Sequence, residues 1–150
     1  MRSIRRIFVH CTASSQDATP EDLMAEFRRK GWRKPGYHYV VDRRGRTYQL
    51  CPDAVVANGV YGYNAKSIHV AYIGGIDDRR MPVDNRTPEQ RQALVELLTG
   101  LRRRYPNAHI LGHRDISPDH NHNGIVDPWE RIKECPCFDA ITEYQSINAL

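Results

Sequence analysis

The stretch SIHVAYIGG, residues 67–75, limits the fold more than any other part of this chain. Apolar residues occupy both of its faces, which is typical of a strand in the middle of a sheet covered on both sides. Two helical patterns can supply that cover. Each begins with Thr-Pro, at Thr19 and at Thr87, where threonine caps the helix and proline occupies its first turn. We therefore predict an α/β fold in which a central mixed β-sheet is flanked by helices.

Other short patterns complete the predicted order of elements. Residues 4–10 form a first strand that ends at His10, residues 36–50 a hairpin, residues 108–113 a last strand that ends at His113, and residues 137–150 a closing helix. A chain of 150 residues is long enough for one domain with its own core, but short for two. We expect a single domain over residues 1–150 and a monomer.

Charge and hydropathy exclude several classes of protein. The 22 basic and 18 acidic residues give a net charge of +4, and the basic residues are scattered, without the motifs of nucleic-acid-binding domains. We therefore expect no nucleic-acid partner. No apolar run approaches the roughly 18 residues of a membrane helix, and the start, MRSIRRIFVHC, lacks the apolar core of a signal peptide. We expect synthesis in the cytoplasm without a signal peptide.

Two of the predicted strands end in histidine, and one cysteine lies before the closing helix. His10, His113 and Cys135 together offer two imidazoles and a thiolate, which is a three-ligand set that leaves a fourth zinc position open for catalysis. The spacing alone also allows the other interpretation, in which these histidines are ordinary surface or hydrogen-bonded residues. The four cysteines include no CxxC pair, and we expect no disulfide framework.

A polar segment, residues 117–132, contains the spacing of a calcium loop, DHNHNGIVDPWE. Gly124 stands at the sharp turn of this loop, and the residues that could bind Ca²⁺ with oxygen atoms are Asp119, Asn121, Asn123, Ile125 (through its carbonyl), Asp127 and Glu130. Two alternatives are a polar surface insertion that matches by drift and transition-metal binding by His120 and His122. The second is disfavoured because those histidines occupy positions that point away from the loop centre.

Six motifs in order carry a family resemblance: FVHCTAS, GWRKPGYHYVV with GRTYQL, GYNAKSIHVAYIGGIDD, TPEQRQAL, HILGHRD and KECPCFD. This set is similar to the zinc-dependent N-acetylmuramoyl-L-alanine amidases, a family that includes amidase-type phage lysozymes and peptidoglycan recognition proteins. The resemblance covers nearly the whole chain except about residues 117–132. It implies the peptidoglycan-recognition fold and hydrolysis of the amide between the lactyl group of N-acetylmuramic acid and L-alanine, as in a phage-type endolysin.

The resemblance also implies the site residues one by one. His10, His113 and Cys135 match the zinc ligands, and Tyr37 and Lys133 match the active-site tyrosine and lysine. Without the resemblance, a packed strand tyrosine and a solvent-exposed lysine would be the simpler interpretations. The implied substrate is peptidoglycan or a muropeptide, reached either at the cell wall after release or as a cytoplasmic wall fragment. Related binding modules have lost a zinc ligand, whereas this chain retains all five residues.

Two positions depart from the resemblance. The motif SIHV has His69 where the phage lysozymes have a pattern like SIGV, which adds bulk to a central strand. The segment VANGVYGYN lacks the histidine that related enzymes often place there. We expect His38, His69 and His109 to be core or edge residues rather than ligands.

Overall fold

A computed structural model of the chain describes residues 2–118, 120–124, 126–131 and 133–150. Its centre is a five-stranded sheet in the order β3-β2-β4-β1-β5. The strands are β1 (Arg6–Cys11), β2 (Tyr39–Val41), β3 (Thr47–Gln49), β4 (Ser67–Tyr72) and β5 (His109–Gly112). Strands β2, β4, β1 and β5 run parallel, and β3 pairs antiparallel with β2. The sheet is therefore mixed, as predicted, and every residue of β4 is buried.

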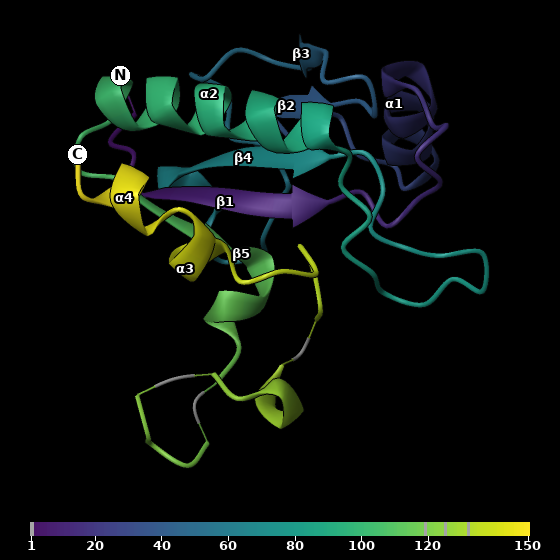
Figure 1. Ribbon diagram of the computed structural model, residues 1–150. Coiled ribbons are helices and arrows are strands. Elements are labelled where there is room, and N and C mark those ends of the chain that lie inside the picture. Colours follow the sequence, from purple (N-terminus) through teal and green to yellow (C-terminus); the bar gives the residue numbers. More distant parts are fainter. Residues whose placement is uncertain (1, 119, 125, 132) are drawn as a thin grey trace.

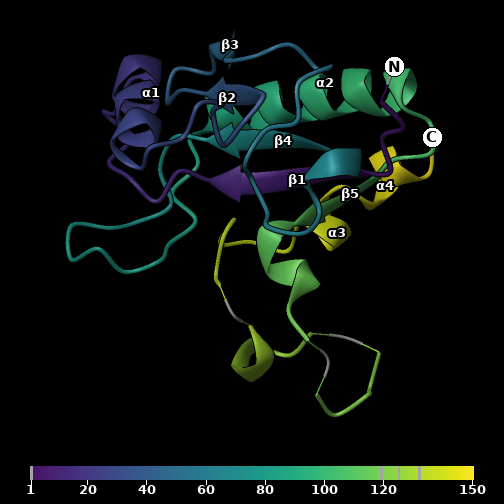
Figure 2. The same cartoon turned by 180° about the vertical axis from the view of Figure 1, so that it is seen from behind.

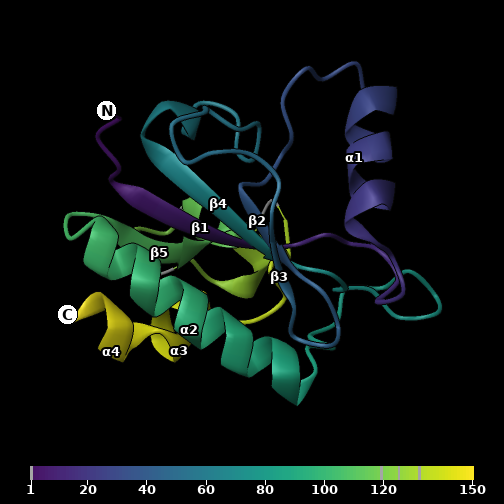
Figure 3. The same cartoon turned by 90° about the horizontal axis from the view of Figure 1, so that it is seen from above.

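Helices cover both faces of the sheet (Figures 1 and 3). Helix α2 (Pro88–Arg104) packs on one face together with two short helices, α3 (Ala140–Glu143) and α4 (Gln145–Asn148). Helix α1 (Pro20–Arg29) covers part of the other face, where its buried side chains meet Val40, Ala71 and Ile73. The rest of that second face carries the histidines described below.

The Thr-Pro starts of the two long helices are confirmed. Thr19 and Thr87 each accept a hydrogen bond from the backbone N–H three residues later, and the side chain of that later residue accepts one from the threonine N–H. Such reciprocal capping satisfies backbone donors that the helix itself leaves unpaired. Apolar residues of α2, among them Leu94 and Leu98, are then fully buried against the sheet.

Two predicted boundaries were wrong. The closing helix is divided into α3 and α4 at Tyr144, a buried residue whose ring meets that of Phe138 edge-on. The last strand stops at Gly112, and His113 begins a 3₁₀ helix, η2 (His113–Ile116). The other short 3₁₀ helices are η1 (Asn64–Lys66) and η3 (Pro128–Glu130).

The segment after η2, which contains η3, projects away from the sheet (Figures 1 and 2). It leaves the body next to the carboxyl end of β5 and returns before α3. Among the described residues, no helix is long and apolar enough to cross a membrane.

Candidate metal centre and active site

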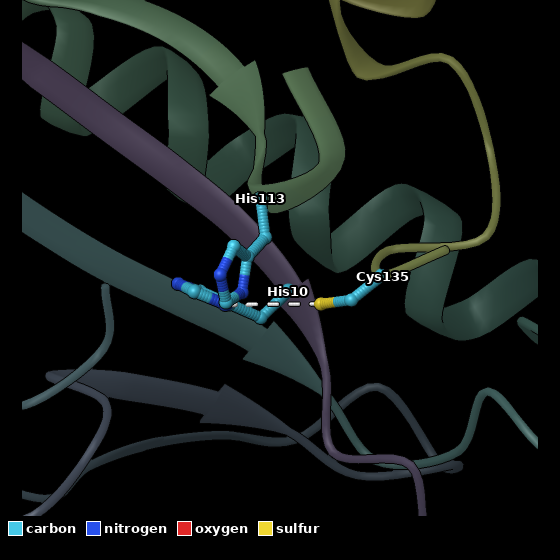
Figure 4. A group of neighbouring side chains, drawn as sticks. All are labelled: His10, His113 and Cys135. Carbon is cyan, nitrogen blue, oxygen red and sulfur yellow. Dashed lines mark hydrogen bonds between the residues drawn. The ribbon is translucent and has the colours of Figure 1, made fainter. Parts of the chain in front are cut away.

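His10, His113 and Cys135 converge at the carboxyl ends of β1 and β5 (Figure 4). β1 and β5 are parallel neighbours, with Val9 opposite Gly112. His10 follows Val9 and His113 follows Gly112, so both histidines lie at the same edge of the sheet. One ligand atom from each of the three side chains lies within 4.8 Å of the others. Within the described part of the chain, this is the one group of three or more His, Cys, Asp or Glu side chains that could hold a metal ion.

Cys135 is held in this group by the backbone around it. The N–H of Cys11 donates to Cys135 Sγ over 3.2 Å, and the N–H of Arg114 donates to the Cys135 carbonyl over 2.8 Å. A Cβ atom on Gly112 would lie 2.6 Å from Pro136 Cδ, so only glycine lets the chain after Cys135 approach β5 this closely. Cys135 is therefore positioned by contacts with β1, which carries His10, and with η2, which carries His113.

The protonation states of the histidines suit metal binding. Burial, followed by the charges of neighbouring groups, holds the pKa of His10 well below its ordinary value. Burial and the charge of Lys133 lower the pKa of His113 to about 4. Near neutral pH both imidazoles are therefore uncharged, and each keeps the lone pair that a metal requires.

The distances also suit one metal ion. His10 Nδ1 lies 3.8 Å from Cys135 Sγ, whereas nitrogen and sulfur ligands of a single tetrahedral zinc lie about 3.5 Å apart, given Zn–N and Zn–S bonds of about 2.1 and 2.3 Å. Two imidazoles and a thiolate form a donor set that zinc accepts. The residues present thus fit the metal that the sequence predicts.

The structure brings Tyr37 to the same place. The ring centroid of Tyr37 lies 5.2 Å from that of His10, and its hydroxyl donates to the Cys11 carbonyl over 3.4 Å. Burial raises the pKa of Tyr37, which keeps its O–H available as a donor. Lys133 is exposed and lies two residues before Cys135, and its positive charge contributes to the lowered pKa of both His10 and His113.

A second histidine lies directly behind His10. His69 Nδ1 is 3.0 Å from His10 Nε2, and the His69 side chain is fully buried. From the sequence, His69 was expected only to add bulk to a central strand. Alternation along a strand places His10 on the same face as Phe8, but the pairing with β4 comes from the structure. In the observed register Phe8 faces His69 and His10 faces Ala71, which places both histidines on one face of the sheet.

The structure describes part of the predicted calcium loop, since Asp119 and Ile125 lie outside the described residues. Gly124 has a φ of 87°, as the predicted sharp turn requires. Glu130 accepts hydrogen bonds from the N–H groups of His120 and Asp127, and Asp127 Oδ2 accepts from the side-chain amides of Asn121 and Asn123 over 3.0 and 2.9 Å. The side chains of Asn121 and Asn123 therefore meet at Asp127, Glu130 binds backbone N–H groups, and hydrogen-bond donors of the loop occupy both carboxylates.

Comparison with known proteins identifies the family. A family model described as N-acetylmuramoyl-L-alanine amidase matches residues 1–136. The endolysin of Klebsiella phage KP32 is 34% identical over 136 residues, which span 89% of this chain and 81% of the endolysin.

Two solved structures show that the fold is shared. The Ph2119 endolysin from Thermus scotoductus MAT2119 bacteriophage Ph2119 matches with a TM-score of 0.75 at 23% identity. The match covers 99% of this chain and 86% of the endolysin chain. Drosophila PGRP-LB matches with a TM-score of 0.69 at 20% identity, and the match covers 97% of this chain and 82% of the PGRP-LB chain. The predicted peptidoglycan-recognition fold is therefore confirmed, and the chain belongs to the N-acetylmuramoyl-L-alanine amidase family.

Proposed function

We propose that this protein is a zinc-dependent endolysin that hydrolyses the amide between the lactyl group of N-acetylmuramic acid and L-alanine in peptidoglycan. The observation that carries the proposal is the convergence of His10, His113 and Cys135, with the ring of Tyr37 beside His10. Membership of the amidase family and the similarity to phage endolysins support the reaction and the substrate.

In this proposal the two histidines and Cys135 hold the metal, and the other two residues act on the substrate. When bound, zinc supplies a Lewis acid for the amide carbonyl and makes water a stronger nucleophile. Water adds to the carbonyl carbon, the C–N bond breaks, and the leaving nitrogen takes up a proton. The Lys133 ammonium and the Tyr37 hydroxyl would stabilise the negative charge that develops on the carbonyl oxygen. One of them also passes the proton to the leaving nitrogen.

Digestion of purified peptidoglycan, followed by mass spectrometry, tests the proposal. Zinc-loaded protein should release stem peptides with a free L-alanine amino group, and chelated protein should release none. His10→Ala should abolish both stoichiometric zinc and hydrolysis. His109→Ala is the matched control, because this histidine is exposed on β5 and its loss should change neither. Peptidoglycan binding without cleavage by zinc-loaded wild-type protein would instead indicate a recognition module.

We also propose that residues 119–130 bind one calcium ion, which orders the segment before Lys133. The ligand spacing and the φ of Gly124 motivate this proposal, and the side chains of Asn121 and Asp127 lie together in the loop. Thermal unfolding of zinc-loaded protein should then move to higher temperature as calcium is added, by an amount set by its concentration relative to Kd. Glu130→Gln should reduce that shift and leave zinc bound. Absence of calorimetric calcium binding at millimolar concentration would rule it out.

A further inference from the structure

A chain of hydrogen bonds leads from His10 into the protein. His10 Nε2 lies 3.0 Å from His69 Nδ1, and His69 Nε2 lies 2.8 Å from Asn64 Oδ1. His10 and His69 are 1% and 0% exposed, so bulk water does not compete for these ring nitrogens. The donors and acceptors within this chain must therefore be mutually consistent.

The far end of the chain fixes the orientation of Asn64. The backbone N–H of Val60 donates to Asn64 Oδ1 over 2.8 Å. A reversed amide would place an NH₂ group against this N–H, two donors facing each other, so the atom at this position is the oxygen. His69 Nε2 lies beside the same oxygen and must carry a hydrogen to bond with it.

The assignment then passes from one ring to the next. A neutral imidazole with hydrogen on Nε2 has its lone pair on Nδ1, so His69 Nδ1 is an acceptor. His10 Nε2 must therefore be the donor of the 3.0 Å bond, which leaves the lone pair of His10 on Nδ1. This is the nitrogen that lies 3.8 Å from Cys135 Sγ, on the side of the proposed metal.

We infer that His69 is a positioning residue for the metal centre: together with Asn64, it fixes His10 in the tautomer whose Nδ1 can bind zinc. This inference rests on the proposed zinc site and adds a role for a residue that is not itself a ligand. Ligating histidines generally donate their second N–H to a neighbouring acceptor, and loss of that acceptor typically lowers metal affinity about 10–100-fold.

The packing around His69 is adapted to this role. A Cβ atom on Gly59 would lie 2.2 Å from His69 Nδ1, so the ring occupies space that a side chain at position 59 would fill. The backbone N–H of His69 donates to His38 Nδ1 over 3.0 Å, which fixes the strand that carries the ring. The two departures noted in the sequence, the added His69 and the absence of histidine from the segment around Gly59, therefore meet at one place.

Two near-isosteric variants separate hydrogen bonding from packing. In His69→Asn, the side-chain oxygen can take the place of Nδ1 and still accept from His10. In His69→Gln, the amide reaches toward Asn64 and provides no acceptor at the Nδ1 position. Zinc affinity is measured by competition with a chromophoric chelator, and the ligand geometry by the visible spectrum of the cobalt-substituted protein. His109→Gln, an exposed change on β5, is the control.

We expect His69→Gln to weaken zinc binding about 10–100-fold and to alter the cobalt spectrum, while His69→Asn stays close to wild type. Equal affinity in wild type and His69→Gln, or equal loss in both variants, would overturn the inference.

A measurement on unmodified protein keeps the result independent of folding. Nitrogen-15 correlation spectra of the zinc-free wild type should show hydrogen on Nε2 of both His10 and His69. Hydrogen on His10 Nδ1 would overturn the inference about His69 but not the proposed function. A wild-type protein that has these tautomers but binds no zinc would instead overturn the proposed function.

Discussion

Acid should destabilise the zinc-free protein through its buried histidines. The lowered pKa of His69 shows the effect most clearly. Burial, followed by the charge of His38, lowers the pKa of His69 to about 3, whereas an unfolded histidine titrates near 6.5. Between these values the unfolded chain binds a proton that the folded protein does not. Stability is therefore complete above about pH 6.5 and falls as the pH falls. At pH 5 the loss assigned to His69 is about 2 kcal/mol, or about 1.4 kcal/mol per pH unit.

Urea unfolding of chelated protein at several pH values between about 7.5 and 5 measures this effect. Near pH 5 the slope of unfolding free energy against pH should be smaller in His69→Asn than in wild type by about 1.4 kcal/mol per unit, and the difference should fade above about pH 6.5. Val70→Ala is the control: it removes buried apolar volume beside His69 without removing a titratable group, so it should lower stability at every pH and keep the wild-type slope. Equal slopes for wild type and His69→Asn would refute the reasoning.

Three further predictions concern catalysis and stability. Tyr37→Phe and Lys133→Ala should each retain stoichiometric zinc and lose about 10²–10³ in turnover; wild-type rates in both would show that neither stabilises the transition state. Leu98→Ala, which empties a fully buried position on α2, should cost about 2–5 kcal/mol in urea unfolding, and a loss near zero would mean that the core collapses to fill the space. Arg86→Ala should cost about 3–5 kcal/mol, because the guanidinium is buried between Asp84 and Glu143; an unchanged midpoint would show that these carboxylates are satisfied without it.

Local signals predicted much of the fold because they are encoded within a few residues. The central place of β4 followed from apolar residues on both of its faces, and the Thr-Pro starts located both long helices. The division of the closing helix was not predictable in this way. It depends on distant contacts, such as the hydrogen bond from Arg86 to the Tyr144 hydroxyl, which join positions 58 residues apart. Local propensity contains no record of such a partner.

The edge of the sheet gives a second example. Asn148, at the end of α4, accepts from the N–H of Ile110 and donates to its carbonyl. These bonds satisfy backbone groups on β5, the outer strand next to β1, which would otherwise lack a neighbour. The sequence around Asn148 does not indicate that it pairs with Ile110, because this contact depends on how α2 and α4 pack against the sheet.

The site was predicted mainly through the resemblance. Spacing alone left His10, His113 and Cys135 open to an ordinary interpretation, and the structure brings their ligand atoms together. His69 was misjudged because its importance lies in the ring nitrogens that face His10 and Asn64. Which nitrogens meet across two strands depends on register and rotamer, and neither can be read from residue type.

The projecting segment also shows how a long insertion can coexist with a fixed metal centre. The N–H of Arg114 donates to the carbonyl of Cys135, so the chain leaves and re-enters the body at one point, and the loop between them closes on itself. The cost of closing such a loop grows slowly with its length, while Cys135 keeps its position through contacts with Cys11 and Arg114. Order within the loop therefore bears less on the thiol than on Lys133, which is exposed and follows the loop directly.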